Sequence, residues 1–221
     1  MRAIILAAGQ GYKLDGFNKL LIVDPKDNKT LLDKYVDAFG EENLTVVLGF
    51  RAINVMHQYP NLNYIFNSDW NVTNNSYSLA IALQNEPCCI LSGDLIVDPD
   101  LLEVLKEDNH NLVITRTREH RTSTALNTVT NTNGIVTEFY QGKLRSQNDR
   151  ESMGVFKIID AGILRKWRQN CFDNPHSFAA QNLPVGDEGS LFEMISDKYE
   201  LFEIDTPLDF LNLIKSRATT R

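Results

Sequence analysis

Cysteine is scarce in this chain of 221 residues, which has only three: Cys88, Cys89 and Cys171. An odd number of cysteines, two of them adjacent, gives no disulfide framework of the kind found in small secreted domains. Zinc-ligand spacing is missing as well, because the four histidines are scattered along the sequence. The stretch EPCCILSGD is therefore interpreted as a buried strand of a protein in a reducing, cytoplasmic compartment.

Long apolar runs and an excess of positive charge are also missing. No apolar stretch approaches the roughly 20 residues that a membrane-spanning helix needs, and the N-terminal AIILAAG is interpreted as a strand rather than a signal peptide. The formal net charge of −7 argues against broad nucleic-acid binding, which needs a basic face. It is compatible with a small anionic ligand, because a few lysines and a divalent metal can set the local field of a cleft. We therefore expect neither a membrane nor a nucleic acid as a partner, and the oligomeric state stays open.

The first half of the chain alternates short apolar runs with helical patterns. Such alternation predicts a parallel sheet with helices on both faces, and near-continuous apolar runs suit its buried strands. The predicted strands are Ala3–Leu6, Leu44–Leu48, Asn63–Phe66, Cys88–Leu91 and Leu112–Thr115, and the predicted helices are Thr30–Phe39, Ile53–Gln58, Ser76–Gln84 and Pro99–Lys106.

The second half has a different pattern. TALNTVTNTNGIVTEFYQGKLRS alternates polar and apolar residues around Asn133–Gly134 and predicts a β-hairpin or meander, and SMGVFKIID predicts another strand. Helices are predicted at Ala161–Asn170 and Glu188–Ile195, followed by a strand in YELFEID and a helix at Pro207–Lys215. Repeats, linkers and low-complexity tracts are missing. The predicted fold is one α/β domain over 1–221, a Rossmann-like doubly wound mixed sheet with a small β-rich insertion.

The N-terminal stretch LAAGQGYKLDGFNKLL looks like a phosphate-binding loop but lacks the marks of the two commonest kinds. A dinucleotide-binding fingerprint needs a third glycine where this chain has Leu14. A P-loop closes on Gly-Lys-Ser/Thr, whereas here Gly16 is followed by Phe17. Both common interpretations are thereby excluded.

The same loop has two features that suit a phosphate. Small residues at LAAGQG let a ligand approach the backbone without interference from Cβ atoms. Lys13 and Lys19 add two ammonium groups, which are point charges suited to phosphate oxygens. The alternative is a tight turn with two solvated lysines.

Acidic residues follow two apolar strands. Asp94 follows CCILSG, and Asp205 follows LFEI. A carboxylate at the C-terminal end of a central parallel strand lies where α/β sheets bind ligands, and Gly93 would let a ligand lie against the backbone. If the two strands are central and point the same way, the two carboxylates would meet, and carboxylates with phosphate oxygens and water are how Mg²⁺ is held.

Each acid also has a structural alternative. GDLIVDPD would be a turn before a helix, with Asp98 as its cap, and DTPLD is a good helix start with Thr206 at the N-cap and Asp209 at N3. Because Thr206 suffices as the cap, Asp205 stays without a structural explanation. The pair of acids, together with the two lysines, favours the metal interpretation.

Asn74, Asn75, Ser76 and Ser78 form a polar cluster at a predicted helix start. Helix N-termini offer unpaired N–H groups, and these side chains add donors and acceptors that suit the edge of a base or an anion. The alternative is an ordinary helix cap, which the same residues would make.

The glycine-rich loop resembles the signature of the nucleotidyltransferase superfamily, Leu-Ala-Ala-Gly-x-Gly-x-Arg followed after a short gap by Lys. The matching residues are Leu6, Ala7, Ala8, Gly9, Gly11 and Lys19. Lys13 stands where the family has Arg, which keeps the charge but loses the bidentate fork, and Asn18 stands where sugar nucleotidyltransferases have Pro. The resemblance implies a sheet of the nucleotide-diphospho-sugar transferase type, a metal held by Asp94 and Asp205, and base contacts from the stretch that contains Asn75, Ser76 and Ser78.

Two further motifs narrow the resemblance. The Asn-Asn-x-Tyr-Ser element at 74–78 is similar to that of choline-phosphate cytidylyltransferases of the bacterial LicC type and of aminoethylphosphonate cytidylyltransferases, and NSDW…SL is similar to the MobA-like molybdopterin cytidylyltransferases. Both imply CTP. In that branch GVFKI and GDEGSLFEMI would close over the acceptor, with Phe156 as an aromatic contact and Asp187 and Glu188 facing a cationic head group. The alternative for the two acids is a solvated start of the next helix, favoured by its dipole.

The chemistry expected is Mg²⁺-dependent nucleotidyl transfer, with about 1–118 as the nucleotide-binding half and about 119–221 as the acceptor-binding half. An oxygen of a small phosphate or phosphonate, such as phosphocholine or 2-aminoethylphosphonate, attacks the α-phosphorus of the NTP, and pyrophosphate leaves. Lys13 would hold the β- and γ-phosphates, and Lys19 the α-phosphate and acceptor oxygens. Three alternatives stay open: a sugar 1-phosphate acceptor, a nucleotide-sugar glycosyltransferase using Asp98 and Asp100 as Asp-x-Asp, and a nucleotide sensor without activity.

Overall fold

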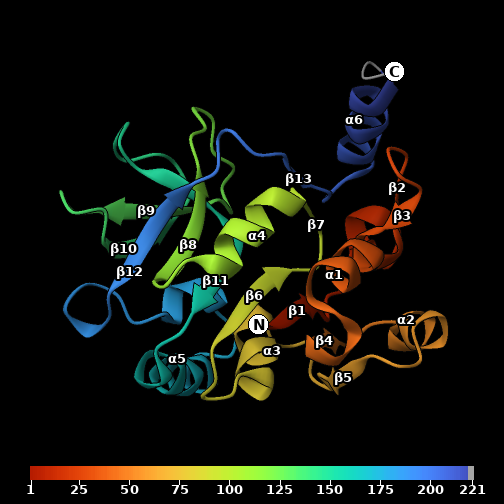
Figure 1. The fold of residues 1–221 in the computed structure, drawn as a ribbon, viewed down its shortest axis with the longest axis horizontal. Coiled ribbons are helices and arrows are strands. Elements are labelled where there is room, and N and C mark those ends of the chain that lie inside the picture. The colour runs from red at the N-terminus through yellow and green to blue at the C-terminus, as the bar shows by residue number, and fades with distance from the viewer. Residues whose placement is uncertain (219–221) are drawn as a thin grey trace.

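One large mixed sheet organises residues 1–218, which a computed structural model describes apart from the side chain of Glu188 (Figure 1). Within these residues the sheet has nine strands in the order β10-β9-β11-β6-β1-β4-β5, and β8 and β12 continue beside β11. They are β1 (Arg2–Ala7), β4 (Leu44–Leu48), β5 (Asn63–Phe66), β6 (Cys88–Ser92), β8 (Asn111–Arg116), β9 (Leu126–Thr130), β10 (Val136–Gln141), β11 (Arg150–Ile158) and β12 (Leu191–Ile195). Two small sheets pair β2 (Val23–Asp24) with β3 (Lys29–Thr30), and β7 (Leu95–Val97) with β13 (Leu201–Glu203).

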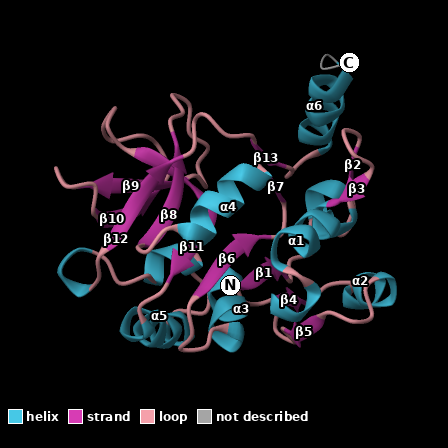
Figure 2. Cartoon of the chain, in the orientation of Figure 1, coloured by secondary structure: helices cyan, strands magenta, loops and turns pink. Residues whose placement is uncertain are grey.

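Helices cover both faces of the parallel strands β6, β1, β4 and β5, as Figure 2 shows. The helices are α1 (Leu31–Phe39), α2 (Ala52–Gln58), α3 (Asn75–Ala82), α4 (Pro99–Glu107), α5 (Ala161–Asp173) and α6 (Pro207–Ala218). Successive residues of a strand point to opposite faces. Ile5 of β1 therefore joins a core with α1, α2 and α4, whereas Ile4 joins a second core with α3 and α5.

The second half of the chain extends the sheet with antiparallel strands. β11 runs antiparallel to β6, β8 and β9, and β9 pairs with β10 across the predicted Asn-Gly turn. Gly134 in this turn has a φ of +74°, a left-handed conformation that glycine adopts without strain. The predicted fold class, a doubly wound mixed α/β sheet with a β-rich insertion, is confirmed. No helix within residues 1–218 is long and apolar enough to cross a bilayer.

One predicted helix is wrong. The stretch Glu188–Ile195 does not form a helix; a 3₁₀ turn at Gly186–Glu188 leads into β12, which runs parallel to β8 with Leu191 opposite Asn111. A short apolar run such as LFEMI does not distinguish strand from helix by periodicity alone. Here the edge of β8 favours the strand over the helix, because pairing satisfies the backbone groups of β8 and buries Leu191.

Helix α6 and the β2–β3 hairpin pack together beside the main sheet (Figure 1). The helix begins as predicted: the hydroxyl of Thr206 accepts a hydrogen bond from the Asp209 N–H at 3.3 Å, and Asp209 accepts one from the Thr206 N–H at 2.7 Å. A small apolar cluster joins α6 to the hairpin and to β7 and β13. Its buried members are Ile22, Leu31, Ile96, Ile204 and Leu213.

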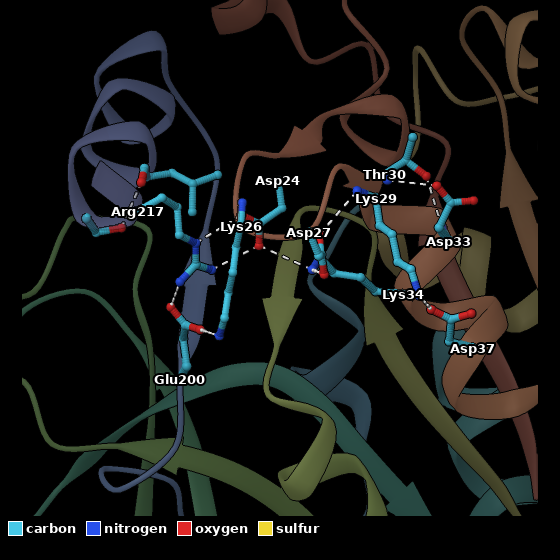
Figure 3. A network of polar contacts seen from close by, with 12 residues as sticks. Asp24, Lys26, Asp27, Lys29, Thr30, Asp33, Lys34, Asp37, Glu200 and Arg217 are labelled. Atoms are coloured by element: carbon cyan, nitrogen blue, oxygen red, sulfur yellow. Dashed lines mark hydrogen bonds and ion pairs between the residues drawn. The ribbon is translucent and has the colours of Figure 1, made fainter. Parts of the chain in front are cut away.

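A buried carboxylate ties the hairpin to the far end of α6. The side chain of Asp24 has no exposed surface, and it accepts hydrogen bonds of 2.9 Å from both Nε and Nη2 of Arg217 (Figure 3). The ammonium of Lys34 lies 3.2 Å away. Burial by itself raises the pKa of Asp24, but the hydrogen bonds from Arg217 and from the Lys26 N–H, with the charge of Lys34, outweigh it and lower the pKa below its usual value.

This shift predicts how Asp24 contributes to stability at different pH. A carboxyl whose pKa is lower in the folded chain stabilises the fold above its unfolded pKa of about 3.9, and the contribution is lost as pH falls through the folded pKa. We expect the unfolding free energy of the wild type to exceed that of Asp24→Asn most at neutral pH, and the difference to shrink below about pH 4. Urea unfolding of both proteins across pH measures it, and a pH-independent difference would contradict the assignment.

Candidate active site

A cleft of about 860 Å³ opens at the C-terminal ends of the parallel strands. This is the edge where open α/β sheets bind ligands, and the volume lies in the upper range for small-molecule sites. The ends of β1 and β6 form its floor, and β11 contributes a wall. All five small or apolar residues matched in the glycine-rich loop line it: Leu6, Ala7, Ala8, Gly9 and Gly11.

Two glycines of the cleft are required by close packing or by backbone conformation. A Cβ at Gly93 would lie 2.7 Å from the Cβ of Ala7 and 3.0 Å from the Leu6 carbonyl oxygen, to which the Gly93 N–H donates a hydrogen bond. Gly11 has a φ of +59° and opens the turn that carries Lys13. The loop therefore lies directly against the end of β6, next to Asp94.

Ammonium and carboxylate groups from distant segments converge at this point. The Nζ of Lys19 lies 3.0 Å from an Oδ of Asp94 and 2.5 Å from an Oδ of Asp205, and the Nζ of Lys13 lies 3.8 Å from the other Oδ of Asp205. Ser92 donates a hydrogen bond of 2.6 Å that orients Asp94. Burial by itself lowers the pKa of Lys19, but Asp94 and Asp205 outweigh it and raise the pKa above its usual value, so the amine stays protonated at neutral pH.

Sequence reasoning missed a third carboxylate, that of Glu203. Ligand oxygens of Asp94, Glu203 and Asp205 all lie within 4.8 Å of one another. The side chain of Glu203 keeps exposed surface, but the protein packed around it, with the negative charges of Asp94 and Asp205, raises the pKa of Glu203 to about 7. The available signal was the Glu-x-Asp spacing, because residues two apart in an extended segment point to the same side. Three carboxylate oxygens are a donor set that suits Mg²⁺.

The polar helix start divides into two groups. Asn75 and Ser78 line the cleft, where Asn75 accepts a hydrogen bond from the Ala179 N–H at 2.8 Å and Ser78 accepts one from Asn67 at 3.0 Å. Ser76 points away: it is fully buried, its hydroxyl bonds to Cys171 and Asn182, and it is not among the described residues that line the cleft. Ser76 therefore connects α3 to α5, and the structure does not bring it to the nucleotide side.

Trp70 is a second residue that the sequence did not single out for the cleft. It lines the cleft beside the loop and packs on Phe50 with 5.1 Å between ring centroids. Gly49 makes this possible, because a Cβ there would lie 2.6 Å from the Trp70 Cβ and 2.6 Å from the Ala8 carbonyl oxygen. The available signal was the NSDW motif, in which Trp70 follows β5.

The acceptor residues expected from the sequence are separated in the structure. Phe156 lines the cleft, and its ring contacts that of Trp167 at 5.6 Å between centroids. Asp187 lies elsewhere, in a separate shallow depression with Asp160 and Asn111, and the side chain of Glu188 lies outside the described part of the chain. Asp187 lies within the 3₁₀ turn Gly186–Glu188, which leads into a strand that pairs with β8, so the structure does not bring it to the cleft where an acceptor head group is expected.

Other charged and aromatic residues also line the cleft. Arg118 and the buried Glu151 form an ion pair of 3.2 Å, and Phe178 adds a ring. The Asp-x-Asp alternative is disfavoured, because Asp98 caps α4 and accepts hydrogen bonds from the N–H groups of Asp100 and Glu200. Neither of the two aspartates belongs to the described residues that line the cleft.

Comparison with solved structures finds close similarity of fold. The CTP:phosphocholine cytidylyltransferase LicC from Streptococcus pneumoniae superposes with a TM-score of 0.73 at 18% identity, covering 97% of this chain and 98% of LicC. The inositol-1-phosphate CTP transferase from T. maritima has a TM-score of 0.70 at 18% identity, covering 98% and 95%. A protein assigned as a glucose-1-phosphate thymidylyltransferase from Bacillus anthracis has a TM-score of 0.68 at 13% identity, covering 98% and 95%.

Comparison with curated protein sequences gives no significant match. The family comparison is more specific, since residues 3–176 match the MobA-like NTP transferase domain. The matched range includes the glycine-rich loop, both lysines and Asp94, and it extends over the parallel strands that build the floor of the cleft. Because the match spans well over half of the chain, this protein belongs to the MobA-like NTP transferase family and has a nucleotidyltransferase-type function.

Proposed function

We propose that this chain transfers the nucleotidyl group of CTP to an oxygen of a small phosphate or phosphonate, releasing pyrophosphate, in a reaction that depends on Mg²⁺. The observation that carries the proposal is the convergence of Lys13 and Lys19 with Asp94 and Asp205 beside the glycine-rich loop. Folding alone does not require segments from opposite ends of the chain to bring such charges to the edge of a cleft.

Asp94, Asp205 and Glu203 are the residues that would hold Mg²⁺. Magnesium prefers oxygen ligands, takes one or two carboxylates, and completes its shell with water and substrate phosphates. When bound, the ion neutralises and orients the triphosphate. Because the carboxylates in this cluster at least balance the two ammonium groups, the protein alone offers no surplus of positive charge to a triphosphate, which supports the need for a divalent cation.

The two lysines divide the remaining electrostatic task. Lys13, at the mouth of the cleft, would contact the β- and γ-phosphates together with loop N–H groups, and Lys19, deeper in, would contact the α-phosphate and the acceptor oxygen. The acceptor oxygen is already anionic, so no protein nucleophile or general base is needed. The protein's contribution is to position two like-charged reactants and to stabilise the charge that develops between them.

We assign the base to the side of the cleft that Trp70, Asn75 and Ser78 line, within the nucleotide-binding half of about 1–118. The small residues of the loop leave room for a flat ring, Trp70 offers a stacking surface, and Asn75 offers an amide to its edge. Two similar structures are CTP-using enzymes by name, which supports CTP as the nucleotide.

Replacement of Trp70 tests this assignment. Stacking of a base on an aromatic ring contributes roughly 1–3 kcal/mol, so Trp70→Ala is expected to raise the KM for CTP about tenfold, with the KM for the acceptor unchanged. Trp70→Phe keeps a ring and is expected to stay within about threefold of the wild type. Initial rates at varied CTP measure both, and an unaltered KM for CTP in Trp70→Ala would remove Trp70 from the base site.

We assign the acceptor to the part of the cleft that residues of about 119–221 line, with Arg118 at its border. Phe156 and Phe178 present aromatic rings there, and Glu151 adds a carboxylate that Arg118 neutralises in part. Rings and a carboxylate suit a small cationic group, which supports phosphocholine or 2-aminoethylphosphonate as the acceptor.

A pyrophosphate-release screen tests the proposed function. The four NTPs are combined with Mg²⁺ and a panel of phosphocholine, 2-aminoethylphosphonate, other phosphate monoesters and sugar 1-phosphates. Pyrophosphate release with CTP and an amine-bearing acceptor is the expected result. Activity with sugar 1-phosphates alone would replace the acceptor class, and release of a nucleoside diphosphate from a nucleotide sugar would indicate a glycosyltransferase. Nucleotide binding without turnover under every combination would indicate a sensor.

A further inference from the structure

Two segments that lie far apart in the sequence carry the groups that meet in the cleft. The first begins with the 3₁₀ turn Lys19–Leu21 and continues into β2, which ends at Asp24. The second contains β13, then Asp205, and leads into α6. Inside the cleft these segments are linked by the ion pair of Lys19 with Asp205, at 2.5 Å.

A second link between the same two segments lies outside the cleft. The guanidinium of Arg217 donates two parallel hydrogen bonds to Asp24, at the end of the first segment, and contacts the carboxylate of Glu200, directly before β13 in the second (Figure 3). Asp24 has no exposed surface, and the side chain of Arg217 is only 9% exposed. Such a two-point contact fixes direction as well as distance, which a single ammonium does not.

The apolar attachment of α6 lies on one face of the helix. Leu213 is its buried residue and packs against Ile22 and Ile204, one from each segment. Its opposite face is exposed, with Leu208 at 61% and Leu211 at 50%. Figure 1 shows the helix projecting beside the β2–β3 hairpin. Arg217, near the end of α6, adds a buried polar contact that ties the helix to both segments.

We propose that Arg217 is a positioning residue. It holds the Lys19 segment and the Asp205 segment in a fixed relative position while Lys19 and Asp205 exchange their ion pair for contacts with substrate and metal. This inference rests on the proposed function. In that function Lys19 turns to phosphate oxygens and Asp205 to a metal, so the direct ion pair between the segments is given up. The contacts of Arg217 with Asp24 and Glu200 persist, because none of these three belongs to the described residues that line the cleft.

The structure offers direct reporters of this link. The N–H groups of Leu21 and Ile22 donate to Asn18 and Lys19 carbonyls at 3.0 Å, and the N–H of Ile204 donates to the Asp94 carbonyl at 2.9 Å. Loosening of either segment would open these bonds and accelerate hydrogen exchange at the amides. Hydrogen exchange at these amides can be measured without a nucleotide or a metal, so the result is independent of the reaction.

The test compares Arg217→Gln, Arg217→Lys and wild type by hydrogen exchange and by steady-state kinetics. In Arg217→Gln, the amides of 19–22 and 204 are expected to exchange hydrogen at least tenfold faster than in the wild type. Its kcat is expected to be at least tenfold lower, and its KM for NTP to change less than threefold. Arg217→Lys, which keeps the charge but not the fork, is expected to restore part of each effect. The matched control is Arg2→Gln, which loses the 2.7 Å pair with Glu86 at the amino end of β1. It is expected to leave the exchange at 19–22 and 204, and the kcat, unchanged.

The outcomes separate this inference from the proposed function. Unchanged exchange at 19–22 and 204 in a folded Arg217→Gln protein overturns the link, and faster exchange with unchanged kcat overturns the positioning role. If the wild type shows no turnover, the proposed function fails, and the exchange of the ligand-free proteins alone then supports or overturns the link. Should Arg217→Gln fail to fold, Glu200→Gln removes the charge that Arg217 contacts in the second segment, together with the 3.4 Å pair of Glu200 with Lys26, and leaves the hydrogen bonds of Arg217 to Asp24 in place. This variant is expected to accelerate exchange at Ile204 while sparing Leu21.

Discussion

Lys19→Ala is expected to lower the turnover number at least about 10²-fold while leaving the fold intact. Loss of one preorganised charged contact in an active site costs on the order of 3 kcal/mol of transition-state stabilisation, which corresponds to that factor. Lys19 contacts both Asp94 and Asp205, and its side chain is 18% exposed, so bulk water replaces its charge poorly. The effect is expected in kcat rather than in KM, because charge builds up at the α-phosphate only as the reaction proceeds.

Turnover at saturating CTP and acceptor, followed by pyrophosphate release, measures this effect. Lys29→Ala is a suitable control, because it removes an exposed ammonium that pairs with Asp37 at 2.7 Å and lies on the β2–β3 hairpin, outside the cleft. The control is expected to retain wild-type turnover. Near-normal turnover in a folded Lys19→Ala protein would exclude Lys19 from the mechanism.

The second large effect is expected for the acids. Asp94→Asn and Asp205→Asn should each raise the Mg²⁺ concentration for half-maximal activity at least ~10-fold, because even the loss of an outer-shell partner costs a metal site roughly 10–100-fold. An amide keeps the shape of the side chain and removes the negative charge, so a change in the titration reports the charge. Glu203→Gln is expected to raise the Mg²⁺ concentration for half-maximal activity as well, since the Glu203 carboxylate belongs to the same cluster.

Asp98→Asn provides the matched control for these acids. Asp98 lies four residues after Asp94 but caps α4 and does not belong to the described residues that line the cleft. It is expected to reduce stability slightly, since Asn is also a good cap, and to leave the Mg²⁺ titration unchanged. A wild-type titration for Asp94→Asn or Asp205→Asn would show that the substituted residue is not a ligand.

Local rules predicted the parts of the site that follow from local structure. Asp94 and Gly93 come directly after an apolar strand, so their place at the sheet edge follows from the fold class. Glu203 follows from the Glu-x-Asp spacing once Asp205 is placed. Trp70 and Arg118 could not be found in this way, because each packs at the cleft against segments distant in sequence. The position of Trp70 depends on Gly49, because the missing side chain of the glycine leaves the space that the Cβ of Trp70 needs.

The errors have the same origin. The stretch from Glu188 to Ile195 pairs with the edge of β8, a contact that no pattern within the stretch reveals. Ser76 has the residue type and position of a cleft residue, yet the direction of α3 turns it toward Asn182. Sequence periodicity determines which face of an element is apolar, whereas the partner of a polar side chain depends on how the elements are oriented.

The contact between Lys19 and its two carboxylates has a consequence for the order in which ligands arrive. The ammonium already sits where a cation is favoured, between Asp94 and Asp205. Under the proposed function, a magnesium ion arriving alone would have to displace this tethered counter-ion, whereas the phosphates of a magnesium–nucleotide complex would offer the ammonium new partners. The proposed function therefore favours joint loading of metal and nucleotide over binding of the bare ion.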